Sequence, residues 1–178
     1  MSFGYSHQKT INTDLFTDAY RVTGEVKVGA GGVQAVLSDQ NTRYMTMSNV
    51  YISRIHTPAS IIASYSECAF NKDNINFLVM QNKSDAVATS NQRSRSVFER
   101  GKDYDVFISV PSFEIHGIIK HEGTVQAASM IRNSVGAFQL VYDAKALAAL
   151  YPDISYSGAV ILVQKSRISI FGVNTHKQ

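Results

Sequence analysis

The residues best suited to bind a charged ligand are concentrated in one polar segment near the middle of the chain. Residues 88–102 contain four cations and one carboxylate, that of Glu99. The cations are Arg93, Arg95, Arg100 and Lys102. Guanidinium groups form hydrogen bonds and ion pairs with phosphate oxygens. The segment therefore predicts weak, salt-sensitive binding to a nucleic-acid backbone. The alternative is a solvated linker or exposed loop whose charges keep it soluble, and its composition favours this interpretation.

The net charge of the protein resides in this segment. The 178 residues include 17 basic and 14 acidic side chains, which gives +3. Residues 1–87 carry seven of each kind and residues 103–178 carry six of each, so both flanking regions are neutral. A broadly basic binding face is therefore not expected, and any electrostatic role falls on the central segment.

Exposed aromatic rings are the second candidate for nucleic-acid binding. Nine tyrosines and nine phenylalanines are present, and most lie in apolar patterns that favour core packing. We expect Tyr44 and Tyr51 to face outward, where their rings could stack on bases of a single strand.

No pattern in the sequence predicts catalysis or a metal site. Cys68 has no basic neighbour to activate its thiol. His116 and His121 are five residues apart, a spacing that places them on opposite faces of a strand unless a bulge intervenes. Gly29–Gly32 lacks the Lys-Ser/Thr ending of a phosphate-binding loop and is expected to turn into another strand. We therefore expect a non-enzymatic protein without metal or cofactor.

The two neutral regions resemble each other. Tyr20–Lys27 aligns with Phe113–Lys120, with a glycine at the same place in each. Later matches in the same order include Val33–Ala35 with Val125–Ala127. A final match pairs residues 79–84 with 163–166. An ordered series of matches indicates an internal duplication.

Each unit is rich in predicted strands. Tyr20–Lys27 alternates apolar and polar residues around Gly24, which predicts a strand with a bulge or bend. Short strands are also expected at Val33–Leu37 and Val125–Met130. The best helical stretch is the Ala/Leu-rich Asp143–Leu150, which a proline ends.

These patterns predict an all-β protein made of two tandem, duplicated, small barrel-like units, with one short helix in the second. Closing a small sheet into a barrel would remove its exposed edges. The expected boundaries are an N-terminal arm over residues 1–18, a first unit over 19–87, the basic segment over 88–102 and a second unit over 103–178. Residues 57–65 form a weaker helical candidate in the first unit.

Several short motifs resemble a family of uncharacterised bacterial β-proteins that repeat such a unit. They are Gly24-x-Val26, Val36-Leu37-Ser38-Asp39-x-Asn41, the strand Tyr44–Met47, and Val79-x-Gln81-Asn82-Lys83. In that family a Leu-Ser-Asp-x-x-Asn turn leads into a hydrophobic strand. The resemblance implies a fold and no activity, and the second unit lacks the Ser-Asp pair. More distantly, the chain is similar to Sm-like barrels, which form rings that bind RNA.

Together these features predict a binding or scaffold protein. One hypothesis is an Sm-like module that binds RNA or another single-stranded nucleic acid, and its alternative is a protein–protein interaction module without nucleic acid. A third hypothesis, a small-molecule pocket between the units or an unrecognised enzyme, has no residue to nominate. A homo-oligomer formed through strand edges is expected in either of the first two cases. The polar N-terminus and the lack of a long apolar run predict a cytoplasmic protein without a membrane partner.

Overall fold

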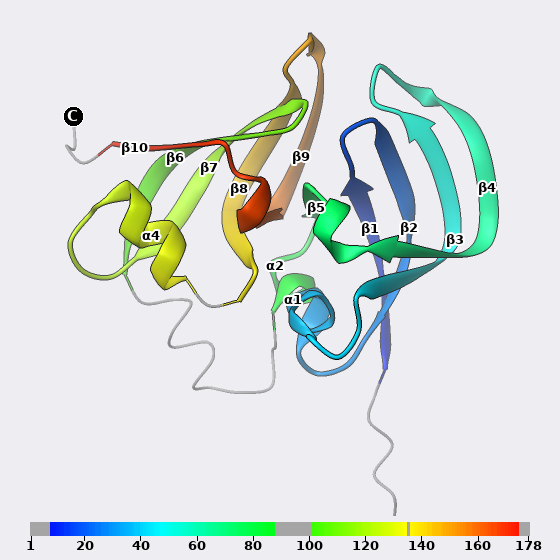
Figure 1. Ribbon diagram of the computed structural model, residues 1–178, viewed down its shortest axis with the longest axis horizontal. Helices are drawn as coiled ribbons and strands as arrows, with labels where there is room; N and C mark the ends of the chain where they lie inside the picture. The colour runs from blue at the N-terminus through cyan, green and yellow to red at the C-terminus, as the bar shows by residue number, and fades with distance from the viewer. Residues whose placement is uncertain (1–7, 88–100, 135, 175–178) are drawn as a thin grey trace, which may run out of the picture.

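The chain folds around one ten-stranded antiparallel sheet (Figure 1). The computed structural model describes residues 8–87, 101–134 and 136–174. The strands are β1 (Lys9–Phe16), β2 (Tyr20–Val28), β3 (Tyr44–Arg54), β4 (Thr57–Asn71), β5 (Phe77–Met80), β6 (Lys102–Val110), β7 (Phe113–His121), β8 (Phe138–Ala148), β9 (Tyr151–Gln164) and β10 (Ile170–Val173). The predicted all-β class is confirmed.

The same order of elements occurs twice along the chain. Two strands, a short helix, two long strands, a 3-10 turn and a short strand make up each set. The helices are α1 (Gly32–Ser38) and α4 (Ala127–Asn133), and the 3-10 turns are η1 (Lys72–Asn74) and η2 (Lys165–Arg167). An additional helix, α2 (Lys83–Ala86), follows the first set. In the sheet, each set has the order fifth, first, second, third, fourth strand.

The second strand of each set bends at a glycine. The pairing of β2 with β3 shifts at Gly24, and that of β7 with β8 shifts at Gly117. Opposite these points, Asn49 and Asp143 have positive φ angles of 51° and 47°. Asparagine and aspartate tolerate this backbone region better than most residues. The bulge predicted at Gly24 is thus present, and its counterpart lies at the matching glycine.

The two sets join through the pairing of β5 with β9. Alternate residues of these strands enter two hydrophobic cores on opposite faces. Leu78, Met80, Val160 and Leu162 belong to the core of the first set, and Phe77, Val79, Ile161 and Val163 to that of the second. Both sets therefore share buried residues across the junction and form one continuous body.

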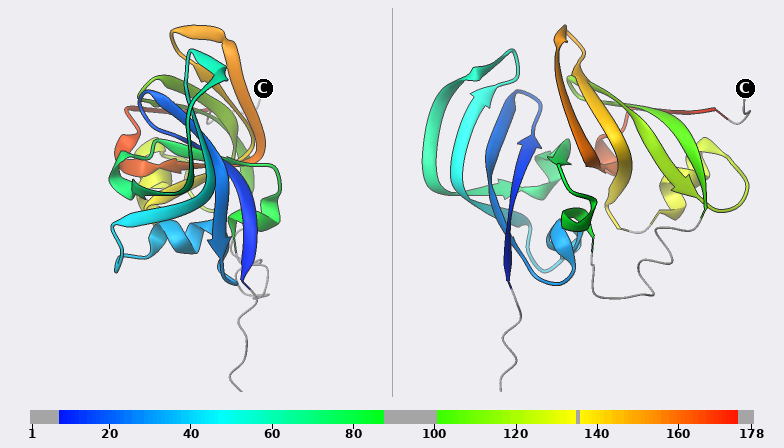
Figure 2. Two further views of the ribbon diagram at one scale, coloured as in Figure 1. Left: turned by 90° about the vertical axis from the view of Figure 1, so that its right-hand side faces the viewer. Right: turned by 180° about the vertical axis from the view of Figure 1, so that it is seen from behind.

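The sheet is open, with β10 at one edge and β4 at the other. The predicted closure of each unit into a barrel is therefore not confirmed. The ends of the β3–β4 and β8–β9 hairpins project at one end of the molecule, and α1 and α2 lie at the opposite end (Figures 1 and 2).

Two segments predicted as strands are helical. Val33–Leu37 lies in α1, where Val33 and Leu37 are buried four residues apart on one face. Most of Val125–Met130 lies in α4, which buries Met130. Both segments are short, and a short apolar run does not distinguish a helix from a strand by periodicity.

The predicted helix at Asp143–Leu150 is wrong, because most of that segment belongs to β8. Ala144, Ala146 and Ala148 are buried at every second position, whereas Lys145 is exposed. The alternation follows the period of a strand, and packing overrides the high helix propensity of alanine. Residues 57–65, the weaker helical candidate, lie in β4.

The segment predicted as an N-terminal arm contains β1. Ile11, Thr13 and Leu15 are buried, and the Thr13 hydroxyl donates a hydrogen bond to the Val79 carbonyl at 3.0 Å. Polar residues lie between these buried positions, so the segment has a low mean hydropathy. For this reason its sequence resembles that of an exposed arm. The boundaries of the repeated units remain a prediction.

Candidate functional site

The predicted nucleic-acid residues are not brought together in the described chain. Arg93, Arg95 and Arg100 lie outside the described residues. Lys102 is exposed at the start of β6. Tyr44 and Tyr51 are exposed on β3, as expected. Six strands (β7, β8, β9, β5, β1 and β2) separate β6 from β3 in the sheet, so Lys102 does not extend a surface formed by these tyrosines.

The glycine turn at Gly29–Gly32 leads into α1 and not into a strand. Its helix start faces carbonyl groups of the neighbouring helix α2: a Cβ added at Gly32 would lie 3.0 Å from the carbonyl oxygens of Asp85 and Ala86. Carbonyl oxygens close to this helix start repel an anion, and the Gly32 amide already donates to the Gly29 carbonyl at 3.2 Å, so the turn is not arranged as a phosphate site.

His116 and Cys68 make packing contacts and show no sign of a metal or catalytic role. A bulge at Gly117 lies between His116 and His121, and His116 packs edge-on against Phe107 at 5.2 Å between ring centroids. Cys68 packs against the first core as a free thiol. Across residues 8–87, 101–134 and 136–174, no three His, Cys, Asp or Glu side chains are grouped to hold a metal ion.

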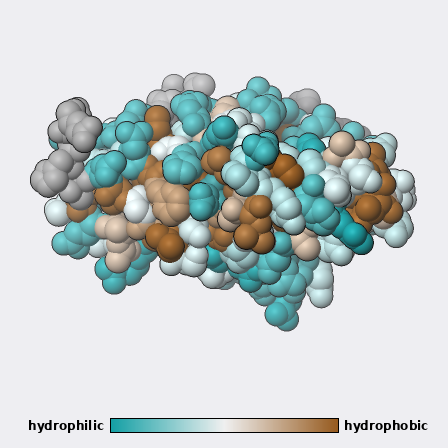
Figure 3. All heavy atoms as spheres, turned by 90° about the horizontal axis from the view of Figure 1, so that it is seen from above, coloured by the Kyte–Doolittle hydropathy of each residue, from teal (hydrophilic) through white to brown (hydrophobic). Residues whose placement is uncertain are grey.

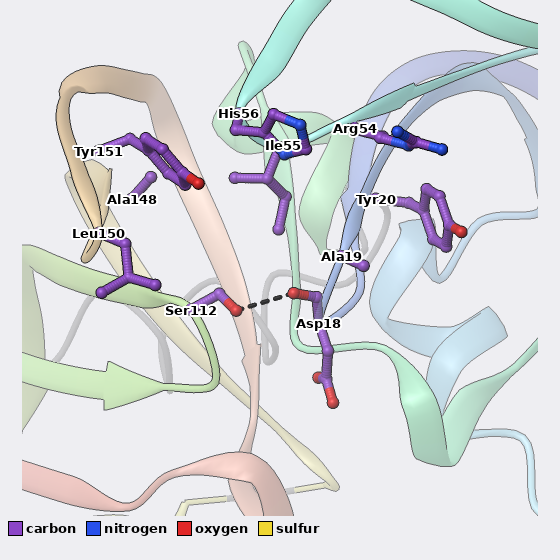
Figure 4. Close-up of a pocket in the computed structure, with 10 residues that line it drawn as sticks. All are labelled: Asp18, Ala19, Tyr20, Arg54, Ile55, His56, Ser112, Ala148, Leu150 and Tyr151. Carbon is purple, nitrogen blue, oxygen red and sulfur yellow. Dashed lines mark hydrogen bonds between the residues drawn. The ribbon is translucent and has the colours of Figure 1, made fainter.

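A pocket lies where hairpin turns of the two sets meet (Figure 4). Its cavity volume is about 450 Å³, and it is partly open to solvent. The β1–β2, β3–β4, β6–β7 and β8–β9 turns all contribute residues. These are Asp18, Ala19, Tyr20, Arg54, Ile55, His56, Ser112, Ala148, Leu150 and Tyr151. Cavities between structural units are a common location for ligand sites.

The pocket combines apolar walls with aromatic and cationic groups. Leu150 and Ile55 lie on opposite sides of the cavity, and the hydroxyl of Tyr151 points towards its centre (Figure 4). The ring centroids of His56 and Tyr151 are 5.7 Å apart with planes inclined by 31°. Figure 3 views this end of the molecule and shows separate hydrophobic patches between hydrophilic residues.

Comparisons with known proteins give no match. No family model, curated protein or solved structure is similar to this chain at a significant level.

A polar network underlies the pocket and links the two sets. Asn76 is fully buried, and its side-chain amide donates to the Asp18 carboxylate at 3.0 Å and to the Pro111 carbonyl at 3.1 Å. The Ser112 hydroxyl donates to the Asp18 carbonyl at 2.8 Å. Arg167 donates to Asn76 Oδ1 at 2.9 Å and also binds the Asp18 carboxylate.

This network sets the ionisation of Asp18. Partial burial would raise the pKa of its carboxyl, but hydrogen bonds from Arg167 and Asn76 and the charge of Arg167 outweigh it and hold the pKa below its ordinary value. Asp18 is therefore an anion paired with Arg167. In Figure 4 its carboxylate points away from the cavity.

The two sheet edges form a second candidate site. β4 has 15 residues, and Glu67 is its one charged residue. Its side chains include Ile61 and Tyr65, which are 60% and 58% exposed. On the opposite edge, Ile170 of β10 is 57% exposed. An exposed edge presents backbone groups that can pair with another strand, and apolar side chains favour such pairing.

The sequence predicts assembly through strand edges but does not indicate that β4 and β10 are those edges, and it assigns no residue to the pocket. The pocket residues come from four turns far apart in the sequence, and none has a recognisable motif. A weak signal was available in the two Pro-containing hairpins, Thr57-Pro58 and Tyr151-Pro152, which begin equivalent strands. No helix within the described ranges is long and apolar enough to cross a membrane.

Proposed function

We propose that this protein is a non-enzymatic scaffold that assembles head to tail from copies of itself. In this assembly the β4 edge of one copy pairs with the β10 edge of the next. The supporting observation is the β5–β9 junction, where the fifth strand of one set already pairs with the fourth strand of the other. β4 and β10 are the fourth and fifth strands without such a neighbour.

The equivalence of β5 and β10 rests on their pairing and hydrogen bonds. Phe16 and Ser109 are equivalent, because they lie opposite Arg21 and Glu114, each three residues before the glycine of its second strand. Phe77 lies opposite Phe16, and Ile170 lies opposite Ser109. The residue before each fifth strand also makes the same contact: the Asn76 amide donates to the Phe16 carbonyl at 2.8 Å, and the Ser169 amide donates to the Ser109 carbonyl at 2.9 Å. Ile170 therefore occupies the position of Phe77.

The equivalence of β4 and β9 rests on the turns that follow them. The Lys72 amide donates to the Arg43 carbonyl, and the Lys165 amide donates to the Ala137 carbonyl, both at 3.0 Å. Lys72 and Lys165 each follow directly on a fourth strand. Counting back from these lysines, Phe70 occupies the position of Val163.

These equivalences define a register for the assembly. At the junction, Phe77 to Met80 lie opposite Val163 to Val160. The same pairing between copies places Ile170 opposite Phe70, Gly172 opposite Cys68 and Val173 opposite Glu67. Ile170 would then enter the core of the neighbouring copy, as Phe77 does within the chain, which accounts for an apolar side chain on the open edge.

Because the two edges differ, the interface is heterologous and generates rings or filaments. Light scattering is expected to give a mass that is a multiple of 19.6 kDa. Ile170→Glu places a charge in the interface and should shift the protein towards monomer. Ile62→Glu, an exposed β4 site outside the paired residues, is the matched control and should leave the assembly unchanged. Retained assembly in Ile170→Glu, or a monomeric wild type at high protein concentration, contradicts the proposal.

A disulfide experiment tests the register. Opposed residues of an antiparallel pair have Cα atoms about 4.5–5.5 Å apart, which suits a disulfide. Gly172→Cys should therefore link to Cys68 of the next copy under mild oxidation and give a ladder longer than a dimer. Gly29→Cys, at an exposed turn away from both edges, is the control. Dimers formed through Cys68 alone would indicate two-fold β4–β4 pairing and overturn the head-to-tail arrangement.

A further inference from the structure

We propose that the pocket between the two sets of strands binds a nucleoside monophosphate unit, either as a free nucleotide or within single-stranded RNA. This site is separate from the sheet edges, and all its residues come from one chain. The proposal rests on the combination of one unpaired arginine, aromatic rings and apolar walls around one cavity.

The free charge in the pocket is positive. Arg54 has no ion-pair or side-chain hydrogen-bond partner among the described residues. The one carboxylate in the lining, that of Asp18, is bound to Arg167 and points away from the cavity. An anionic ligand would therefore find donors at the rim without competing for an existing ion pair.

The aromatic residues are placed to hold a planar group. Tyr151 and His56 lie on neighbouring turns of different sets with their rings inclined by 31°. Tyr20 lies on the far side of the cavity beside Arg54 (Figure 4). Bases stack on tyrosine and histidine rings without requiring a particular base. A base on Tyr151 would leave its sugar against Ile55 and its phosphate at the rim, on the side where Arg54 is exposed.

The size of the cavity agrees with a ligand of this class. Pockets for small molecules have volumes of about 300–1,000 Å³, and the cavity, at about 450 Å³, is within that range. Its base is fixed by the hydrogen bond from Ser112 to the Asp18 carbonyl, which joins the β6–β7 turn to the β1–β2 turn. The pocket is therefore held open by the junction between the sets and does not require the ligand to form it.

Calorimetric titration with AMP, adenosine, ribose 5-phosphate and inorganic phosphate tests the proposal. AMP should bind more tightly than each of the other three, because it alone provides both a base and a phosphate. Equal binding of AMP and inorganic phosphate would indicate simple charge attraction and overturn the proposal. Absence of AMP binding together with absence of RNA binding at low salt would do the same.

Variants identify the groups responsible. Tyr151→Ala should weaken AMP binding about tenfold or more. Arg54→Gln should weaken AMP by roughly tenfold and adenosine little. Tyr65→Ala and Arg43→Gln are the matched controls, because Tyr65 is exposed on β4 and Arg43 is exposed immediately before β3, away from the pocket at its other end. If the pocket variants bind like the controls, the proposal is wrong.

The source of the nucleotide is resolved by a further titration. A short single-stranded RNA that binds more tightly than AMP and depends on Tyr151 assigns the pocket to RNA, whereas tighter binding of AMP assigns it to a free nucleotide. The Ile170→Glu variant should bind the ligand like the wild type, because the pocket lies within one chain. A loss of binding in that variant would contradict the proposed site while leaving the assembly proposal intact.

Discussion

Arg167 Nε donates a hydrogen bond to Asn76 Oδ1 at 2.9 Å and so joins the second set of strands to the first. Asn76 also uses both protons of its amide, on Asp18 and Pro111. Its backbone amide donates to Phe16, and its carbonyl accepts from Gln164. A fully buried side chain with all its polar groups satisfied specifies one arrangement of the surrounding segments.

Asn76→Ala is expected to destabilise the protein. The substitution removes the acceptor of Arg167 and the donor to the Pro111 carbonyl, and unsatisfied buried groups cost about 1–3 kcal/mol. Urea denaturation at neutral pH should therefore show a loss of about 2 kcal/mol in the free energy of unfolding. Asn74→Ala, at an exposed position in η1, is the control. A change in Asn76→Ala no larger than that in Asn74→Ala would contradict the role of the network.

Acid should weaken the contribution of Asp18. Its pKa in the folded protein lies below the ordinary value of 3.8, so the folded state favours the charged form. The resulting stabilisation is fully present above the ordinary pKa and is lost as the pH falls through the lower, folded value. The difference in unfolding free energy between wild type and Asp18→Asn should be constant near neutrality and shrink below a pH of about 4. A difference that grows in acid would contradict this assignment.

The sequence predicts the fold class and the matched glycines because these depend on local periodicity. Gly24 and Gly117 are recognisable since each interrupts a strand pattern. The alanines of β8 led to a wrong helix prediction for a physical reason. Alanine favours helices in isolation, but here burial between neighbouring strands determines the structure. Local pattern is thus reliable where the intrinsic propensity of the residues and their burial favour the same structure.

The arrangement of the two sets lies beyond local pattern. The sequence match of residues 79–84 with 163–166 is wrong, because Val79 lies in a fifth strand and Val163 in a fourth. The error arises because β5 and β9 lie side by side at the junction and have the same apolar composition. Pocket and edges both depend on this long-range pairing, so motifs and local composition alone do not locate them.

Gly117→Ala is expected to destabilise the protein through close packing. A Cβ at this position would lie 2.7 Å from Val141 Cγ1, 2.8 Å from Ala144 Cβ and 2.9 Å from the Tyr142 carbonyl oxygen. Overpacking of this kind costs about 1–3 kcal/mol. Thermal unfolding should show a lower Tm than for Gly29→Ala, where a Cβ would meet no atom within 4 Å. Equal Tm values for the two variants would show that the bulge relaxes without cost.

Tyr156→Phe is expected to leave the protein as stable as the wild type or more so. The Tyr156 hydroxyl is buried and has no hydrogen-bond partner among the residues that the structure describes. Its burial raises the pKa of the phenol, an effect that the charge of Asp14 increases and that of Arg21 opposes. Replacement by phenylalanine removes an unsatisfied buried group and keeps the ring 4.6 Å from that of Phe16.

The control for this prediction is Tyr156→Ala, which also removes the ring. Removing a large, fully buried side chain usually costs about 3–5 kcal/mol of unfolding free energy. Because Tyr156 is only partly buried, the loss in Tyr156→Ala should lie towards the lower end of that range. Chemical denaturation of the three proteins under one condition gives the comparison. If Tyr156→Phe loses more than about 1 kcal/mol, the hydroxyl has a partner in solution and its environment is more polar than the packing around Phe16 indicates.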